Sequence, residues 1–280
     1  MSSVRTYDPT LYAGSAPHYR RGRPPYSPQL EATLVGELGL DGRGRLLDVG
    51  CGPGILTLRL AALFEEAIGL DPDADMLAEG RAAAEAGRIA TVRWVHARAE
   101  DLPDAAPGPY RLVTFGQSYQ WTDERQVAEA VYDMLEPGGA MAMVVHSVEG
   151  RPRPDSPSHP PIPHDELRAL VVKYLGSLQR MGQGTAAVRD HRFEDVLVQT
   201  RFGQPRTVLA PGIPDLLRDV DSVISGYLST SYSAPHLYGD RLDDFIADAG
   251  TLLESRSADG LFWDWPGDTA IILAEKVAAS

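Results

Sequence analysis

Three alternate glycines, Gly50, Gly52 and Gly54, stand in the stretch LLDVGCGPGILTLRLA between an expected buried strand and an expected apolar helix. Glycine has no Cβ, so the backbone N–H groups of such a turn can approach a ligand closely. The helix that follows adds the positive end of its dipole. Asp48 ends the strand two residues before the turn, where its carboxylate can orient the loop or meet a cationic amine. The turn therefore predicts a ligand site.

The spacing of these glycines separates two classes of nucleotide site. The dinucleotide fingerprint is G-x-G-x-x-G, whereas this turn reads G-C-G-P-G, and the G-K-[ST] of a Walker A loop is also missing from it. Asp71 ends the second expected strand, where an acidic side chain can accept hydrogen bonds from both ribose hydroxyls. The segment ARAEDLP (97–103) follows the third expected strand and can offer Glu100 and backbone groups to an adenine edge. These features disfavour a dinucleotide and favour another ligand.

Strands and helices alternate along the first half of the chain and would position these residues. The strands read as nearly continuous apolar runs, which is typical of a parallel sheet covered by helices on both faces. We expect strands over 44–50, 65–71, 90–97, 110–118 and 140–148, with helices over 28–40, 54–64, 74–87 and 123–135. The regularity ends at 149–165, which holds six prolines and cannot be a central strand or a helix interior.

The composition and the net charge of the chain exclude several classes of partner and site. The chain has 280 residues and a net charge of −13, which argues against a nucleic-acid partner because such affinity depends on cationic side chains. Cys51 is the single cysteine, so an internal disulfide and a cysteine-rich zinc site are excluded. An N-terminal apolar segment of the secretory type and a run of about 18 apolar residues are both missing from the sequence. We expect a cytoplasmic protein without a membrane partner.

Four motifs occur in order and at familiar intervals: LLDVGCGPG, GLDPDADML, RAEDLP and MLEPGGAMAMV. Together they resemble the class I S-adenosylmethionine-dependent methyltransferases, over about residues 20–148 and more weakly towards the C-terminus. The segments RPPYSPQL and FGQSYQWTD are similar to the branch that includes trans-aconitate methyltransferase-like and other small-molecule enzymes. The resemblance implies an α/β fold with a doubly wound, mostly parallel, seven-stranded Rossmann-like sheet. It would have an antiparallel C-terminal strand and a mostly helical insertion after the fifth strand.

The resemblance also implies a division of the chain. Residues 1–28 would be an N-terminal lid segment and 29–148 the S-adenosylmethionine-binding core. Residues 149–260 would be a proline-rich connector and helical substrate insertion, with a probable sheet strand at 206–212. Residues 261–280 would hold the C-terminal sheet strand, as an aromatic-rich strand pair or one bent strand.

Cofactor contacts carry over from the resemblance, motif by motif. The methionine part would meet Asp48 and the glycine turn, and the ribose would meet Asp71. The adenine would lie near Met76 and the pair Ala99 and Glu100. The full set of expected cofactor residues is Tyr19, Tyr26, Asp48, Gly50, Cys51, Gly52, Gly54, Asp71, Pro72, Met76, Ala99, Glu100, Gln117 and Ser118. Arg98 departs from the acidic residue that many relatives have there, which puts the side-chain contact to the adenine amine in doubt.

The implied reaction moves a methyl group from S-adenosylmethionine to an oxygen, nitrogen or carbon of a small organic acceptor by in-line displacement. S-adenosylhomocysteine would be the product, and no metal is expected. His146 and His236 are candidate general bases, and Trp121 and Tyr232 are candidate walls of the acceptor pocket. The protein would act as a monomer or homodimer on a small molecule, without nucleic acid. A carboxylate acceptor would need no base.

Three other functions remain open from the residues alone. The fold can bind S-adenosylmethionine and carry out other chemistry such as cyclisation, since fold does not fix function. A nicotinamide-dependent oxidoreductase is disfavoured by the missing third fingerprint glycine. A non-enzymatic interaction protein would leave the cofactor motifs without a purpose. The identity of the acceptor and the atom that is methylated are not determined by the sequence.

Overall fold

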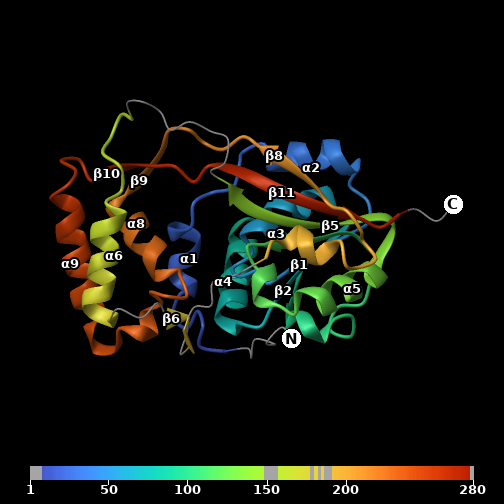
Figure 1. Cartoon of the computed structure of the whole chain (residues 1–280), viewed down its shortest axis with the longest axis horizontal. Helices are drawn as coiled ribbons and strands as arrows, with labels where there is room; N and C mark the ends of the chain where they lie inside the picture. The colour runs from blue at the N-terminus through green and yellow to red at the C-terminus, as the bar shows by residue number, and fades with distance from the viewer. Residues whose placement is uncertain (1–7, 148–156, 177–179, 182–183, 186–190, 278–280) are drawn as a thin grey trace.

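A central seven-stranded sheet organises the molecule in the computed structural model, which describes residues 8–147, 157–176, 180–181, 184–185 and 191–277. The strand order is β3-β2-β1-β4-β5-β11-β8, and β5, β11 and β8 can be seen side by side in Figure 1. The first five strands pair in parallel, and β11 runs antiparallel to both β5 and β8. The strands are β1 (Arg45–Val49), β2 (Glu66–Asp71), β3 (Val92–His96), β4 (Tyr110–Gly116), β5 (Leu135–Ser147), β8 (Arg206–Ala210) and β11 (Asp268–Glu275). This confirms the predicted sheet, including its antiparallel strand.

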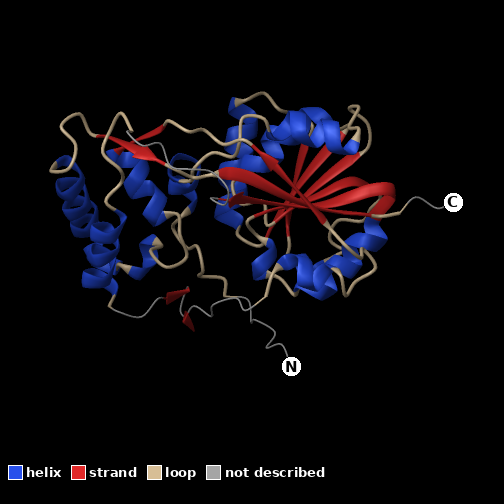
Figure 2. Ribbon diagram, turned by 45° about the horizontal axis from the view of Figure 1, so that its top comes forward, coloured by secondary structure: helices blue, strands red, loops and turns tan. Residues whose placement is uncertain are grey.

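Helices cover both faces of this sheet (Figure 2). Successive side chains of a strand point to opposite faces, so Leu46 enters one apolar core and Leu47 the other. The first core includes residues of α2 and α3, and the second includes residues of α5 and α7. The helices associated with the sheet are α2 (Leu30–Leu38), α3 (Ile55–Leu60), α4 (Ala74–Ala86), α5 (Glu124–Met134) and α7 (Phe193–Leu197), with short 3-10 turns at Ala61–Leu63, Ala99–Asp101 and Tyr119–Trp121.

A helical unit lies beside the sheet and has its own apolar core (Figure 1). Its elements are α6 (His164–Leu175), β9 (Leu216–Asp219), α8 (Val220–Leu228), α9 (Leu242–Glu254) and β10 (Leu261–Asp264), with 3-10 turns at Pro235–Leu237 and Gly239–Arg241. The strands β9 and β10 pair antiparallel with each other, apart from the main sheet. The aromatic-rich C-terminal stretch is therefore two strands in two different sheets. A further short pair is β6 (Arg180–Met181) with β7 (Gly184–Thr185).

The segment before α2 joins the two units. Its helix α1 (Ala16–Gly22) packs on α8 so closely that a Cβ on Gly22 would lie 2.3 Å from the Ser225 carbonyl carbon. On the helical unit, Ser15 Oγ donates to the Leu228 carbonyl at 2.8 Å. On the sheet side, the Ser27 N–H donates to Thr269 Oγ1 at 2.7 Å. The predicted lid segment thus contacts both units, although its first seven residues lie outside the described part of the chain.

The boundaries proposed from the sequence remain predictions. The start of the proline-rich connector, residues 148–156, lies outside the described residues. Among the helices that the structure describes, none is long and apolar enough to cross a membrane.

Candidate functional site

The glycine turn after β1 depends on conformations that disfavour other residues. Gly50, Gly52 and Gly54 have φ angles of 64°, 53° and 71°, in the left-handed region that glycine enters without steric cost. Two of them also lack space for a side chain. A Cβ on Gly50 would lie 2.5 Å from the Ser118 Cβ, and a Cβ on Gly54 would lie 2.3 Å from the Trp94 ring. The sequence expectation of a tight turn at this point therefore has a steric reason.

Two buried carboxylates flank this turn. Asp48, 1% exposed, accepts hydrogen bonds from Thr57 Oγ1 at 2.6 Å and from Thr114 Oγ1 at 2.8 Å. Asp71, 8% exposed, accepts the Gly52 N–H at 2.8 Å and the Asp73 N–H at 2.9 Å. Burial is the main cause that raises the pKa of each carboxyl group to about 6. Asp71 thus ties the turn to the end of β2.

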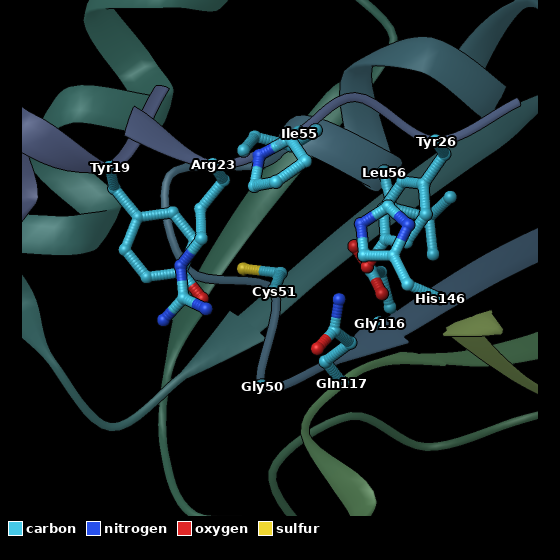
Figure 3. Close-up of a pocket in the computed structure, with 12 residues that line it drawn as sticks. Tyr19, Arg23, Tyr26, Gly50, Cys51, Ile55, Leu56, Gly116, Gln117 and His146 are labelled. Atoms are coloured by element: carbon cyan, nitrogen blue, oxygen red, sulfur yellow. The ribbon is translucent and has the colours of Figure 1, made fainter. Parts of the chain in front are cut away.

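A cavity of about 480 Å³, a volume that includes the space open to solvent, lies above the turn (Figure 3). Its wall combines the turn, the ends of β4 and β5, and the segment that surrounds the end of α1. The lining residues are Tyr19, Arg23, Pro24, Tyr26, Asp48, Gly50, Cys51, Ile55, Leu56, Gly116, Gln117 and His146. Ligand sites of doubly wound sheets lie at this carboxyl edge of the strands.

An aromatic pair forms one side of the cavity. The rings of Tyr26 and His146 are stacked, with centroids 5.1 Å apart and an interplanar angle of 21° (Figure 3). His146 Nδ1 is buried and has no hydrogen-bond partner among the described residues. Burial lowers the pKa of His146 below its usual 6.5, so the imidazole is neutral at physiological pH. A neutral imidazole with a free ring nitrogen can accept a proton.

Seven of the predicted site residues line this cavity: Tyr19, Tyr26, Asp48, Gly50, Cys51, Gln117 and His146. Gln117 has a φ of 54°, a strained conformation for a residue with a side chain. Burial is the main cause that raises the pKa of the Cys51 thiol well above its usual value, so the thiol is protonated at neutral pH.

Other predicted residues lie outside the cavity wall, and several have partners within the protein. The Ser118 hydroxyl donates to the Val49 carbonyl at 2.5 Å beneath the turn. One carboxylate oxygen of Glu100 accepts the Asp123 N–H at 3.0 Å, and the other lies 3.2 Å from the Arg98 guanidinium. Both oxygens therefore have partners within the protein. Met76 is 2% exposed within α4. The adenine contacts predicted for this end of the site, which also include Pro72 and Ala99, remain predictions.

The candidates for the acceptor side lie at different places. His236 is outside the cavity lining, and its Nδ1 lies 3.1 Å from the Ala13 carbonyl oxygen. Trp121 packs edge-on against Tyr12, with ring centroids 6.2 Å apart. Tyr232 is 39% exposed. The structure therefore places His146, and not His236, beside the glycine turn.

The sequence analysis missed Arg23, Pro24, Ile55, Leu56 and Gly116 as lining residues. Arg23 and Pro24 belong to the segment RPPYSPQL, so the motif that carried the family resemblance also contained this signal. Among the residues that the structure describes, there is no group of three or more His, Cys, Asp or Glu side chains arranged to hold a metal ion.

Comparison with known proteins gives a methyltransferase match over the core of the chain. Residues 46–139 match a family model described as a methyltransferase domain. Trans-aconitate 2-methyltransferase of Streptomyces avermitilis is 35% identical over 162 residues, which cover 56% of this chain and 55% of the relative. Malonyl-[acyl-carrier protein] O-methyltransferase of Enterobacter lignolyticus is 32% identical over 142 residues, 50% of this chain and 54% of the relative.

A third relative is named for a different kind of acceptor, a tRNA. It is the tRNA 5-carboxymethoxyuridine methyltransferase of Escherichia coli K12, 28% identical over 108 residues, which cover 38% of this chain and 41% of the relative. The chain thus spans about half the length, or less, of these curated relatives. A solved structure of a protein from Bacillus halodurans C-125 has a TM-score of 0.50 at 16% identity, covering 88% of this chain and 98% of that chain. At that identity the likeness concerns the fold alone.

Proposed function

Because residues 46–139 match a methyltransferase domain, we propose that the protein is a class I S-adenosylmethionine-dependent methyltransferase that transfers the methyl group to a small organic acceptor. The observation that carries this proposal is the cavity at the carboxyl edge of the sheet, which joins the glycine turn to the Tyr26–His146 pair. One end suits a cofactor and the other suits an acceptor. S-adenosylmethionine supplies a sulfonium-bound methyl group that is already activated for transfer.

Asp48 fits the amine of the cofactor. Its two oxygens accept neutral threonine hydroxyls, and no described lysine, arginine or histidine forms an ion pair with it. A buried carboxylate without a cationic partner favours a cationic ligand. The glycines of the turn carry no side chain that would block the methionine part. Asp71 stands at the end of β2 where a ribose would lie.

On the acceptor side of the cavity, the protein mainly has to align the acceptor with the methyl group, and reactive side chains matter less. Holding an acceptor in line with the bond that breaks can supply on the order of 7–11 kcal/mol of the barrier. The rings of Tyr19, Tyr26 and His146 form part of the cavity wall against which an acceptor would pack. His146 would remove a proton from a hydroxyl or amine acceptor, and an ionised carboxylate would not need it.

A small molecule is favoured over tRNA as acceptor. The net charge of −13 would repel a phosphate backbone. The cavity, lined by residues of the sheet and of the α1 segment, has a size suited to a small molecule.

Calorimetric titration with S-adenosylmethionine, S-adenosylhomocysteine and NAD(H) tests the cofactor, followed by an acceptor screen that measures S-adenosylhomocysteine formation. Micromolar binding of the first two, with turnover in the screen, supports methyl transfer. Binding of both without turnover of any acceptor would favour other S-adenosylmethionine chemistry such as cyclisation. Binding of NAD(H) alone would overturn the proposal.

Replacing Asp71 with alanine is expected to weaken S-adenosylhomocysteine binding at least tenfold. The substitution removes the proposed ribose contact and the hydrogen bonds from the Gly52 N–H in the turn and from the Asp73 N–H. A hydrogen bond to a charged group contributes about 1.5–3 kcal/mol. The matched control is Asp73→Ala, which removes the N-cap of α4 and should cost about 1 kcal/mol of stability with little change in affinity. Equal losses of affinity in both variants would contradict the role of Asp71.

Affinity for S-adenosylhomocysteine is expected to fall as the pH is lowered from 7.5 to 5. The ionised form of Asp48 would bind the ammonium group, and with its pKa at about 6 the carboxyl group becomes protonated over this range. Below pH 6 the loss approaches about tenfold per pH unit for each proton that binding must release. Calorimetry in buffers of different ionisation enthalpy counts these protons, and Asp48→Asn should bind weakly with a flatter pH dependence.

The raised pKa of Asp48 has the opposite effect on the stability of the protein without ligand. The folded pKa of about 6 lies above the ordinary value of 3.8, so the folded state binds a proton more readily than the unfolded state. Stability without ligand should therefore rise as the pH falls from 6 towards 4 at this group. For the binding prediction, an affinity for S-adenosylhomocysteine that does not change with pH would show that Asp48 does not bind the amine of the cofactor.

A further inference from the structure

Trp94 packs against the last glycine of the turn without lining the cavity. It belongs to β3 and is the partner of Gly69 in the neighbouring strand β2. Its indole ring fills the space that a side chain on Gly54 or Gly69 would need, because a Cβ at these positions would lie 2.3 Å and 2.7 Å from the ring. A Cβ on Gly80 in α4 would also lie 2.7 Å from it. The turn, a strand and a helix thus leave room for one ring.

Two of these glycines have no conformational reason to be glycine. Gly69 lies inside β2 and Gly80 inside α4, and neither has a φ in the left-handed region. Glycine is unfavourable in the interior of a strand or a helix, since it loses the most conformational freedom on folding. In a strand it often marks a place of close approach. The empty space at both positions is therefore what the fold requires there, and the indole of Trp94 fills it.

The glycine turn is held at both of its ends. At its beginning, the N–H groups of Gly50 and Cys51 donate to the Leu70 carbonyl at 2.7 Å and 3.0 Å, which fixes this end to β2. At its other end, Gly54 is the N-cap of α3 and meets the indole of Trp94. The ring therefore determines how far the end of the turn stands from β2 and α4.

We propose that Trp94 is a positioning residue of the cofactor site, an inference that rests on the proposed function for the identity of the ligand. Its indole holds the glycine turn in the shape that binds the cofactor before the cofactor arrives. Binding to a turn that is already ordered avoids the loss of affinity that ordering it would cause. Because Trp94 does not line the cavity, it would act only through the turn.

Substitutions matched in size test this proposal in the full chain. Trp94→Leu removes most of the ring and leaves a gap beside Gly54, whereas Gly80→Ala keeps the ring and displaces it with a methyl group. The double variant combines the smaller side chain with the added methyl group. Gly250→Ala is the matched control, because Gly250 lies inside α9 and a Cβ there meets no atom within 4 Å. Thermal melting establishes that each variant folds, and Trp94→Phe takes the place of Trp94→Leu should the latter not fold.

Calorimetry with S-adenosylhomocysteine measures the effect on the proposed ligand. We expect Trp94→Leu and Gly80→Ala each to weaken its affinity by about tenfold, and the double variant to lose clearly less than the product of the two losses, because substitutions of residues in contact are not additive. Gly250→Ala should bind as the wild type does. Losses that simply multiply in the double variant, or wild-type affinity in both single variants, would overturn the proposal.

The thiol of Cys51 gives a second measurement that needs no cofactor. Cys51 is the single cysteine of the chain, lies in the turn and is 8% exposed, so its reaction with an aromatic disulfide reagent reports how often the turn opens. Trp94→Leu and Gly80→Ala should each raise this rate by about tenfold, at a value that stays constant at low urea concentrations because the opening is local. A role in overall stability alone would instead give a rate that increases with urea.

The thiol measurement also separates this proposal from the proposed function. An unchanged thiol rate in both single variants, or an increase that arises only from global unfolding, overturns the positioning role of Trp94 whatever the affinity does. Failure of the methyltransferase proposal would differ, because the wild-type protein would then not bind S-adenosylhomocysteine while the thiol rate would still respond to the size of residue 94.

Discussion

Replacing His146 with phenylalanine is expected to lower kcat by about 10²–10⁴-fold, the usual contribution of a general base, with an acceptor whose reacting group must lose a proton. Phenylalanine keeps the ring that stacks on Tyr26 and removes both ring nitrogens. The unpartnered Nδ1 beside the cavity is the atom that would accept the proton. Because the cofactor contacts are left in place, S-adenosylhomocysteine affinity should hardly change, and the loss should appear in kcat rather than in KM.

The pH dependence gives a second readout for His146. Burial holds the pKa of this imidazole below its usual 6.5, and a base must be unprotonated to act. The wild-type rate should therefore be flat at neutral pH and fall only on the acid side of 6.5. Tyr26→Phe is the matched control, since it retains the stack and removes only the phenol. A loss of less than tenfold in His146→Phe would show that His146 is not the base and would point to an acceptor that is already ionised.

Replacing Arg218 with methionine is expected to lower the free energy of unfolding by about 3–5 kcal/mol, the usual cost of removing one partner of a buried ion pair. The side chain of Arg218 is 8% exposed and that of Asp264 is 13% exposed, with 3.0 Å between Nη1 and Oδ2. Nη2 also donates to the carbonyls of Gly22 and Ser222, both at 2.6 Å. The substitution would leave Asp264 buried without its cation and the end of α1 without a donor.

Denaturant unfolding of three variants checks the Arg218 prediction. Arg218→Met with Asp264→Leu removes both charges and should recover part of the loss, since a buried pair can be replaced by apolar side chains at little cost. Arg201→Met is the surface control, because Arg201 is 46% exposed and pairs with Glu129 and Asp133. Exposed pairs contribute about 0–1 kcal/mol. Equal losses for Arg218→Met and Arg201→Met would show that burial of the first pair has no energetic weight.

The sequence by itself determined the core of the fold. Alternation of apolar strands with helices predicted the parallel part of the sheet, because strands covered on both faces need apolar residues at every position. The strand at 206–212 was also visible as a local pattern and is observed as β8. The turn at Gly50 to Gly54 was predicted from its glycines alone, since the left-handed conformation is a local property of the residue.

Only the tertiary structure decided which of the predicted residues meet. Ser118 and Gln117 are neighbours in the sequence, yet Ser118 bonds the Val49 carbonyl beneath the turn while Gln117 lines the cavity. The direction of each side chain at the end of a strand depends on the strand beside it. Local patterns along the chain carry no information on that neighbour.

The same reason explains the residues that the sequence analysis did not assign. Arg23 enters the cavity because α1 packs on α8, about two hundred residues further along the chain. The strand at Leu261–Asp264 leaves the main sheet because its partner is Leu216–Asp219 in the helical unit. Periodicity predicts that a segment forms a strand or a helix, whereas pairing between distant segments is settled by the burial that the folded chain achieves as a whole.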